Sequence, residues 1–367
     1  MIRVDAINDL RRHTALQADT LAASVARVIG SGWFLLGLEL EAFEAEFAAY
    51  CGAAHCVGVA NGTDALELAL RASGVGLGER VLTVANAGAY STTAIRAVGA
   101  EPVFVDIDDG TLLIDAVEVG RQLASARTSA LIVTHLYGRV VPAIGEIATA
   151  ARSAGVPLIE DCAQAHGARL GGRLAGTFGE FGCFSFYPTK NLGALGDGGA
   201  LITASAELRD RVRMLRQYGW ASKYRIELPG GRNSRLDELQ AAVLRAKLPR
   251  LDGWNARRRE IAQQLSGGIS NRKVTCPQYF GEDYVAHLFV VRTADRQSLQ
   301  AHLRARGIAY DVHYPLLDYQ QPAFCASGRE HHNLVAEKAC REVLTLPCFP
   351  EMSDGEVAAV VDAVNSW

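Results

Sequence analysis

Residues 182–193, which read GCFSFYPTKNLG, decide the fold and the chemistry that we expect of this chain. A short aromatic strand is expected a few residues before Lys190, and a glycine-rich run follows at 193–199. A lysine at the mouth of a strand can lose its hydration and act as an amine nucleophile that forms a Schiff base with a carbonyl. The alternative is a surface lysine in a loop, which is the commoner fate of this residue type. The other four lysines of the chain lie in polar or helix-like segments.

Apolar runs alternate with helical patterns from about residue 55 to residue 205. The expected strands are at 55–60, 81–84, 102–106, 130–133, 157–161 and 183–186, and the expected helices include 64–72 and 144–153. Continuous apolar strands that alternate with helices predict an α/β fold with a largely parallel sheet covered on both faces. Ligands of such sheets gather beyond the carboxyl ends of the strands. Thr63, Asp161 and Lys190 come at or just beyond such ends.

The pattern changes from about residue 239. A long helical segment at 240–265 is expected to link two domains, and the second is expected to be a smaller α/β domain. Its expected elements are a strand at 287–291, a helix at 296–306, a strand that ends at His313-Tyr314, and helices at 334–343 and 354–364. The sequence therefore predicts a large domain over residues 1–247 and a small domain over residues 248–367.

The composition is typical of a soluble enzyme with a sizeable core, because 49% of the 367 residues are hydrophobic and 21% are charged. The net charge of −3 gives no electrostatic reason to expect a nucleic-acid partner. No window approaches the ~18 uncharged apolar residues of a membrane span, and the N-terminus lacks the apolar core of a signal peptide. The eight cysteines have no zinc-like spacing and are expected to be small buried side chains. We expect a cytoplasmic protein without a bound metal.

The segment 61–65, Asn-Gly-Thr-Asp-Ala, follows an expected strand and opens an expected helix. Free N–H groups and the helix dipole at such a point suit a phosphate. The signal is weak by itself, because glycine with threonine or aspartate is also an ordinary helix cap. Ser185 and the segment 230–235 could add hydroxyl, amide and guanidinium donors.

The segment 160–167, Glu-Asp-Cys-Ala-Gln-Ala-His-Gly, meets a second need of the same kind of cofactor. A carboxylate at a buried strand end, such as Asp161, can hold a pyridine nitrogen protonated, because the adjacent cation and anion stabilise each other. Protonation makes the ring an electron sink for a carbanion. An isolated Glu-Asp pair is about as often a helix cap or a metal ligand as it is the partner of a cofactor ring. A metal is disfavoured here because no second acidic or histidine cluster has suitable spacing.

Together these motifs resemble the sugar aminotransferases of the DegT/DnrJ/EryC1/StrS family, which use pyridoxal 5'-phosphate. The resemblance extends over nearly the whole chain, and several linked motifs occur in the same order. These motifs lie at 31–37, 43–48, 61–66, 160–167, 185–190, 235–242, 313–315 and 344–347. The resemblance implies an aspartate aminotransferase-like α/β fold, PLP fold type I, with a mainly parallel seven-stranded sheet flanked by helices and a smaller C-terminal α/β domain.

Matching positions imply roles for individual residues. Lys190 would be the Schiff-base lysine, Asp161 the partner of the pyridine nitrogen and Gln164 the residue that faces the ring hydroxyl. Thr63, Asp64 and Ser185 would bind the phosphate, and Gly62 would be a further cofactor-binding residue. Asn233 and the nearby Arg235 correspond to a segment that reaches the cofactor of the neighbouring subunit. The resemblance therefore implies a homodimer with shared active sites.

Two departures from the family pattern concern the cofactor ring and the substrate. Gly88 stands where the family usually has an aromatic ring stacked on the cofactor, and Tyr90 is expected to take over that face. The alternative for Tyr90 is a core tyrosine at a helix start. Tyr319 stands where the family tends to have a histidine shortly after its His-Tyr-Pro motif. The candidate substrate contacts are Arg235, His313, Tyr314 and Tyr319.

We therefore expect a transaminase with ping-pong kinetics. Glutamate is the expected amino donor, and the expected acceptor is a keto sugar attached to a nucleoside diphosphate. The segments 33–37 and 51–56 favour conversion of a dTDP-3-keto-6-deoxyhexose to a dTDP-3-amino-3,6-dideoxyhexose. Aminotransferases that act on 4-keto sugars or on inososes are the alternatives within the family.

Other classes are disfavoured by the same residues. Family dehydratases have a histidine at the position of Lys190. A regulator that binds the cofactor or a sugar nucleotide without catalysis would have no need to retain Lys190, Asp161 and Gln164 together. A nicotinamide-dependent oxidoreductase is disfavoured because no G-x-G-x-x-G follows the first strand with an acidic residue at the proper distance.

Overall fold

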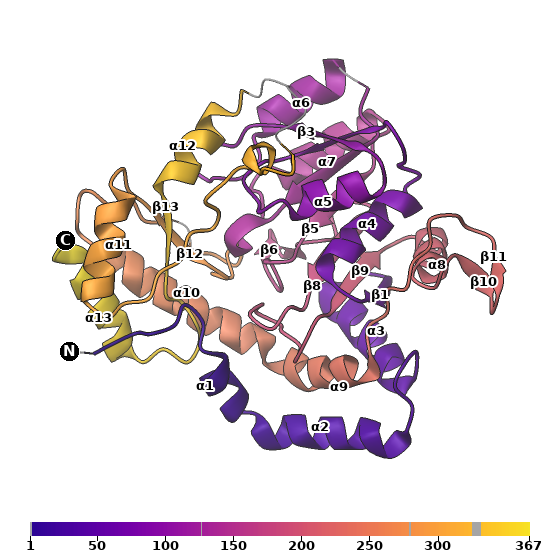
Figure 1. Ribbon diagram of the computed structural model, residues 1–367, viewed down its shortest axis with the longest axis horizontal. Coiled ribbons are helices and arrows are strands. Elements are labelled where there is room, and N and C mark those ends of the chain that lie inside the picture. Colours follow the sequence, from indigo (N-terminus) through magenta and orange to yellow (C-terminus); the bar gives the residue numbers. More distant parts are fainter. Residues whose placement is uncertain (1, 126, 279, 325–331) are drawn as a thin grey trace.

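The computed structural model describes residues 2–125, 127–278, 280–324 and 332–367 (Figure 1). A seven-stranded sheet forms its centre, with the strand order β1-β9-β8-β5-β4-β2-β3. The strands are β1 (His55–Val59), β2 (Arg80–Thr83), β3 (Glu101–Phe104), β4 (Ala130–Thr134), β5 (Leu158–Asp161), β8 (Phe181–Ser185) and β9 (Gly199–Thr203). β9 is antiparallel to β1 and β8, and the other neighbouring pairs are parallel. The predicted α/β fold with a mainly parallel sheet is confirmed.

Helices cover both faces of the sheet, because successive side chains of each strand point to opposite faces and both sets are apolar. One face is covered by α4 (Gly62–Ala72), α5 (Tyr90–Ala97) and α8 (Ala206–Leu215). The other face is covered by α3 (Leu38–Cys51), α6 (Ala116–Ser125), α7 (Ile144–Ser153) and α9 (Glu238–Lys247). Strand β5 shows the alternation: Leu158 belongs to one apolar core and Ile159 to the other.

The C-terminal part is a smaller α/β unit with its own apolar core. Its elements are α10 (Leu251–Gly268), β12 (Phe289–Arg292), α11 (Arg296–Ala305), α12 (Leu334–Glu342), β13 (Val343–Leu346) and α13 (Asp354–Asn365). β12 and β13 form an antiparallel pair. The strand expected to end at His313-Tyr314 is absent from the described residues, where Ile308 and Asp311 form isolated bridges, to Val4 and Thr345. The sequence pattern did not predict β13, which follows α12 without a turn.

The helix expected at 240–265 is interrupted. α9 ends at Lys247, the 3-10 turn η2 occupies Leu248–Arg250, and α10 begins at Leu251. The cause is Pro249, because proline has no N–H for the helix and its ring clashes with the preceding turn. The break lies at the border that we predicted between the two domains. The division at residues 247 and 248 stays a prediction.

The N-terminal segment packs on the C-terminal unit (Figure 1). The Val4 N–H donates to the Gly307 carbonyl at 2.9 Å, and the Ala309 N–H donates to the Val4 carbonyl at 2.7 Å. In the following helix α1 (Leu10–Ala15), Arg12 forms two hydrogen bonds to Glu356 at 2.7 and 2.9 Å. Helix α2 (Ala18–Ser31) then runs along the lower edge of the molecule in Figure 1 towards α3.

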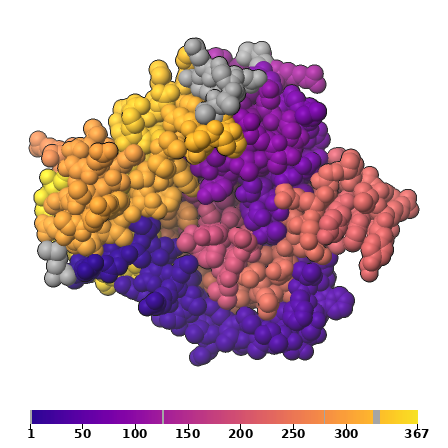
Figure 2. All heavy atoms as spheres, viewed as in Figure 1, coloured from indigo at the N-terminus to yellow at the C-terminus, as the bar shows by residue number. Residues whose placement is uncertain are grey.

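Four short strands and two 3-10 turns lie outside the two sheets described above. The strands are β6 (Arg169–Leu170), β7 (Arg173–Leu174), β10 (Trp220–Ser222) and β11 (Arg225–Ile226), and the turns are η1 (Leu136–Gly138) and η3 (Asp318–Gln320). The hairpin of β10 and β11 projects from the body of the molecule in the ribbon and space-filling views (Figures 1 and 2).

Six of the seven described cysteines are buried, and the seventh, Cys276, is half-buried. None of these seven forms a disulfide, as expected for small buried side chains. Cys325 lies outside the described residues. In the part of the chain that the structure describes, no helix combines the length and the apolar character that crossing a bilayer requires.

The carboxylate of Glu160 anchors the backbone between β7 and β8. It is fully buried and accepts the N–H groups of Gly176, Phe178 and Gly179 at 2.6–2.8 Å. A fourth bond, at 2.9 Å, joins it to Nε2 of His135. His135, Glu160 and Cys162 are the one described group of close metal-ligand atoms. Because the Glu160 oxygens already accept four hydrogen bonds, a structural role explains this group.

Glu160→Gln is expected to lower the free energy of unfolding by about 2–3 kcal/mol, because the new amide group would face two buried N–H donors. Urea unfolding of the cofactor-free protein measures this change. Glu207→Gln is the matched control: Glu207 is exposed, so its variant is expected to change stability by less than about 0.5 kcal/mol. Equal unfolding free energies for the two variants would contradict the role assigned to Glu160.

Candidate active site

A cavity of about 820 Å³ lies at the carboxyl ends of β5 and β8. The residues predicted from the sequence that line it are Gly62, Thr63, Tyr90, Asp161, Gln164, Ser185, Lys190, His313 and Tyr314. The sheet and the C-terminal unit both contribute to this lining. The parallel strand order therefore brings together segments that are far apart in the chain, as expected for an α/β sheet.

Lys190 and Asp161 place opposite charges in this cavity. Loss of hydration lowers the pKa of the Lys190 amine to about 8, although the nearby Asp161 carboxylate favours the charged form. Burial raises the pKa of Asp161, and the Ala163 N–H, which donates to it at 3.1 Å, partly opposes this effect. An amine with a pKa of about 8 has a neutral fraction near physiological pH. It can therefore act as a nucleophile and as a proton acceptor.

Gln164 has a fixed amide orientation. Its Oε1 accepts the Tyr137 N–H at 2.6 Å, so its Nε2 is the donor and lies 3.1 Å from the Tyr314 hydroxyl. Gln164 is buried and lines the cavity three residues beyond Asp161. The arrangement presents an N–H donor to the cavity on the same segment as the Asp161 carboxylate.

The start of helix α4 forms one end of the cavity. Asn61 caps the helix, because its Oδ1 accepts the Asp64 N–H at 2.8 Å. A Cβ atom on Gly62 would lie only 2.7 Å from Cβ of Ser185, so glycine allows β8 to approach the helix start. Thr63 and Ser185 line the cavity there. N–H groups, hydroxyls and the positive end of the helix dipole together suit a phosphate.

A model of the DegT/DnrJ/EryC1/StrS aminotransferase family matches residues 16–365. The chain belongs to this family. The resemblance found in the sequence is thereby confirmed, and with it the classification as an aminotransferase.

Characterised relatives of the family match nearly the whole chain. A dTDP-3-amino-3,4,6-trideoxy-alpha-D-glucose transaminase from Streptomyces venezuelae is 45% identical over 360 residues, which cover 96% of this chain and 93% of that protein. A dTDP-3-amino-3,6-dideoxy-alpha-D-galactopyranose transaminase from Aneurinibacillus thermoaerophilus is 44% identical over 360 residues, which cover 98% of this chain and 98% of that protein.

Two solved structures have the same fold as this chain. The S. venezuelae DesV structure in complex with a ketimine intermediate has a TM-score of 0.95 at 43% identity, and the match covers 100% of this chain and 99% of DesV. The NtdA structure from Bacillus subtilis with bound cofactor PMP has a TM-score of 0.92 at 26% identity, and the match covers 99% of this chain and 85% of NtdA.

The position where the family usually has a stacked aromatic ring is filled differently in this chain. Gly88 has φ +79°, and a Cβ atom there would lie 2.9 Å from two ring atoms of Tyr314 and 3.0 Å from Cε2 of Tyr90. The rings of Tyr90 and Tyr314 meet edge to face, with centroids 6.2 Å apart. Two tyrosines from separate segments therefore occupy the space beside Gly88. That Tyr90 covers the cofactor ring stays a prediction.

Gly88→Ala is expected to lower the free energy of unfolding by about 1–3 kcal/mol, because it combines a strained backbone with a side-chain clash. It is also expected to shift the near-UV circular dichroism of the tyrosines. Gly120→Ala, on helix α6 with open space around its Cβ, is the control and is expected to be neutral or stabilising by up to about 1 kcal/mol. If both variants unfold like the unchanged protein, the close packing at Gly88 is refuted.

Several cavity residues were missed by sequence reasoning. These are Ile7, Asn8, Leu66, Ala163, Tyr187, Thr189, Asp197, His287, Leu288 and Asp311. Asn8 reaches the site from the N-terminal segment, where its Nδ2 donates to the Thr189 carbonyl at 3.0 Å. No local sequence pattern predicts such a contact. His287 offered one signal, because it is a polar residue at the start of the expected apolar strand at 287–291.

Four predicted residues do not line the cavity of this chain. The Asp64 carboxylate pairs with Arg232 at 3.2 Å, and the Tyr319 hydroxyl donates to Glu337 at 3.2 Å. Asn233 is exposed, and its backbone forms an isolated antiparallel β-bridge with Gln217. Arg235 is half-buried outside the cavity lining. Asn233 and Arg235 were predicted to serve a neighbouring subunit, and their roles, like those of the other site residues, stay predictions.

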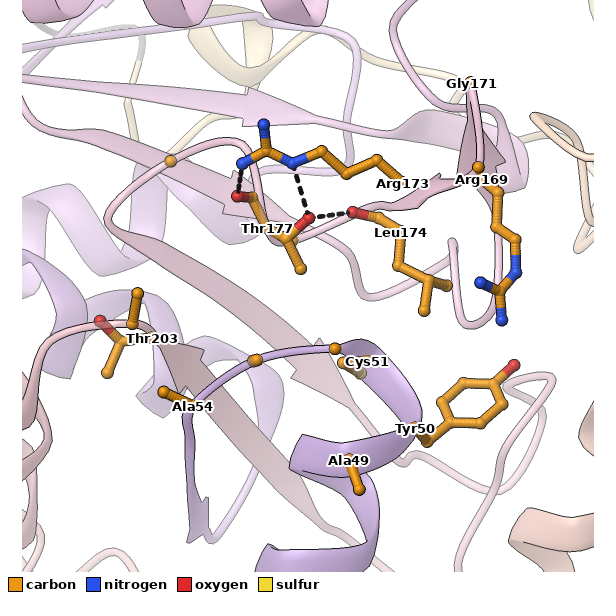
Figure 3. Close-up of a pocket in the computed structure, with 16 residues that line it drawn as sticks. Ala49, Tyr50, Cys51, Ala54, Arg169, Gly171, Arg173, Leu174, Thr177 and Thr203 are labelled. Atoms are coloured by element: carbon orange, nitrogen blue, oxygen red, sulfur yellow. Dashed lines mark hydrogen bonds between the residues drawn. The ribbon is translucent and has the colours of Figure 1, made fainter.

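A second cavity, of about 750 Å³, lies at the opposite ends of the strands (Figure 3). The β6–β7 hairpin and the end of α3 line it, and Arg173 is bonded to Thr177 within it. None of the residues predicted for catalysis or cofactor binding is among those that line it. The chemistry of Lys190 therefore belongs to the first cavity.

Proposed function

We propose that this aminotransferase uses pyridoxal 5'-phosphate and moves an amino group from glutamate to a nucleotide-linked keto sugar. The observation that carries the proposal is the Lys190 amine with a lowered pKa beside the buried Asp161 carboxylate in one cavity. The NtdA structure described above, which has the same fold, contains bound PMP, the pyridoxamine form of this cofactor.

The described residues fit this cofactor. The Asp161 carboxylate is buried with a raised pKa, so it would be stabilised by a protonated ring nitrogen. The start of α4, with Thr63 and Ser185, would hold the phosphate. Nε2 of Gln164 would donate to the ring hydroxyl. When bound, pyridoxal phosphate supplies an aldehyde and an electron-withdrawing ring.

Lys190 has two tasks in this proposal. Its neutral amine would attack the aldehyde carbon and hold the cofactor covalently. Once displaced by the amino donor, Nζ would take the proton from the donor α-carbon and later return a proton to the acceptor sugar. Asp161 would remain ionised throughout and keep the ring nitrogen protonated. One amine in two roles explains why the two half-reactions would follow each other with ping-pong kinetics.

The two characterised relatives described above support a dTDP-linked sugar as the acceptor, since both are named for 3-amino products. We propose conversion of a dTDP-3-keto-6-deoxyhexose to the corresponding dTDP-3-amino-3,6-dideoxyhexose. Purified protein with pyridoxal phosphate, glutamate and a panel of 3-keto and 4-keto dTDP sugars and an inosose tests this. Release of 2-oxoglutarate is expected with the 3-keto sugars. Release with the 4-keto sugars or the inosose alone would overturn this choice of acceptor.

Lys190→Ala is expected to lower kcat by about 10³-fold or more, because the nucleophile and the proton carrier are removed together. The release of 2-oxoglutarate with the accepted sugar measures this. Lys273→Ala is the control, because Lys273 is exposed and lines neither cavity. Normal turnover by the Lys190 variant would remove the mechanism.

We further propose a homodimer with shared active sites. Large apolar side chains are exposed on the α2–α3 connection and on the β10–β11 hairpin, among them Trp33 at 64% and Ile226 at 63%. Such side chains are typical of an interface with another protein. Asn233 and Arg235 follow this hairpin in the sequence and do not line the cavity of their own chain.

Mixing inactive variants tests the sharing of sites. Lys190→Ala and Arg235→Ala are each expected to be nearly inactive, and refolding them together is expected to restore about a quarter of the activity. Half of the dimers would then be mixed, and each of these would have one intact site. Light scattering gives the mass of the particle. Activity of the mixture no higher than that of the single variants would contradict the shared site.

A further inference from the structure

The buried carboxyl group of Asp318 connects the short turn η3 to the start of helix α5. Asp318 is only 1% exposed, although aspartate is a charged residue type. Its Oδ1 accepts the Ala89 N–H at 2.9 Å, and its Oδ2 is bonded to the Thr92 hydroxyl. The N–H of Asp318 itself donates to the Ala85 carbonyl at 2.8 Å. One residue thus holds the segment 85–92 at three points.

The backbone of this segment needs such a support. Gly88 has φ +79° and Ala89 has φ +64°, so two successive residues adopt the left-handed conformation. In alanine this conformation costs free energy, because Cβ approaches the following carbonyl, and it persists where the surroundings hold it. Ala89 is also the cap residue of α5 and has no side-chain oxygen for the free N–H groups of the helix. The Asp318 carboxyl group supplies the bond that holds Ala89, and it lies at the positive end of the helix dipole.

The same turn sets the place of Tyr90. Tyr90 is the first residue of α5, its side chain is 50% exposed, and it lines the cavity. Its ring meets the ring of Tyr314, which comes four residues before Asp318. The segment 314–318 therefore supports Tyr90 twice, by ring packing and by the turn that leads into α5. Asp318 is not one of the described residues that line the cavity, so its effect on a bound molecule must pass through Tyr90 and its turn.

Both protonation states of Asp318 preserve these bonds. Burial raises the pKa of Asp318 to about 7, and the bonds from Thr92 and Ala89 oppose this shift. The Thr92 hydroxyl can donate to the ionised carboxylate and can accept from the protonated carboxyl group, while Oδ1 accepts the Ala89 N–H in both states. An asparagine would do the same, since its carbonyl oxygen can accept from Ala89 while its amide group donates to Thr92.

We propose that Asp318 is a positioning residue for Tyr90: it fixes the start of α5 so that the Tyr90 ring covers the cofactor ring in the cavity. This role rests on the function proposed above and on the prediction that Tyr90 replaces the aromatic ring that is missing at Gly88. Gly88 leaves the space that the rings of Tyr90 and Tyr314 occupy, and Asp318 holds the turn that brings Tyr90 there.

Substitutions at Asp318 distinguish its hydrogen bonds from the rest of the side chain. Asp318→Ala removes both acceptor atoms, and Asp318→Asn retains an acceptor for Ala89 and a partner for Thr92. Thr92→Val has a similar size, removes one of the bonds, and tests the same link if the Asp318→Ala protein does not fold. Asp295→Ala is the matched control, because Asp295 caps α11 in the C-terminal unit, where it accepts the Ser298 N–H at 3.3 Å.

Amide hydrogen exchange in the cofactor-free protein tests the link to the helix start. Peptides that cover residues 86–97 are expected to exchange about tenfold faster in Asp318→Ala, because the Ala89 N–H loses its acceptor and the turn opens more often. Asp318→Asn is expected to stay within about twofold of the unchanged protein, and Thr92→Val is expected to lie between these two variants. Asp295→Ala is expected to leave these peptides unchanged. Exchange at the unchanged rate in Asp318→Ala, or in Thr92→Val if that variant alone folds, would overturn the proposal.

The affinity for pyridoxamine 5'-phosphate tests the link from Asp318 to the cofactor. This probe has no aldehyde, so its dissociation constant reports the contacts in the cavity without a covalent bond to Lys190. Tyr90→Ala is expected to raise the dissociation constant by about 5–10-fold, because the stacked ring is lost. Asp318→Ala is expected to raise it by about threefold or more, because a helix start that is no longer fixed must be ordered on binding. Asp318→Asn is expected to raise it by less than about twofold.

The double variant shows whether Asp318 acts through Tyr90. In the Tyr90→Ala background, Asp318→Ala is expected to change the dissociation constant by less than about twofold, because the ring to be positioned is gone. An equal rise with and without the Tyr90 side chain would contradict the positioning role. So would an Asp318→Asn protein that binds the probe as weakly as Asp318→Ala, because the hydrogen bonds would then not be the cause.

The same titrations separate this inference from the proposed function. No binding of pyridoxamine 5'-phosphate by the unchanged protein would refute the use of this cofactor, and the role of Asp318 would be refuted with it. Binding by the unchanged protein, with the same dissociation constant in Asp318→Ala, would refute the positioning role alone. Neither result depends on the amino donor or on the acceptor sugar.

Discussion

The attraction between the Lys190 amine and the Asp161 carboxylate is the constraint on which the site depends. Each group alone would be driven to its neutral form by the loss of water around it. Burial lowers the pKa of Lys190 and raises that of Asp161, and each charge opposes the shift of the other. The Lys190 amine, with a pKa of about 8, is thus close to the balance between its charged and neutral forms, where an amine can exchange protons at little cost.

The sheet supplies the rigidity that this balance needs. Asp161 ends β5, and it is paired in register with Cys183 of the neighbouring parallel strand β8. Glu160, one residue earlier, faces the other way and anchors the backbone around residues 176–179 through its buried carboxylate. Because the two carboxylates alternate across the strand, one serves the fold and the other serves the cavity. Small shifts of β5 would therefore disturb both.

Much of the fold and part of the site could be predicted from the sequence, because their signals are local. Apolar runs of four to six residues indicated the parallel strands, and Lys190 and Asp161 follow directly from strand ends. Pro249 is a visible signal that the helix expected at 240–265 is interrupted. The placement of His287 and Asn8 could not be read in this way. Their places in the cavity wall depend on which distant segments pack around the cavity, and one chain's periodicity does not encode that.

The N-terminal segment has a consequence for the order in which the molecule can assemble. Val4 is bonded to the backbone at residues 307 and 309, and Asn8, a few residues later, reaches the carbonyl just before Lys190. During synthesis the first residues must wait for almost the entire chain to leave the ribosome before they find these partners. The large sheet can form earlier, but this part of the cavity wall is added last. Nascent chains would therefore fold the sheet before they can bind a ligand in the cavity.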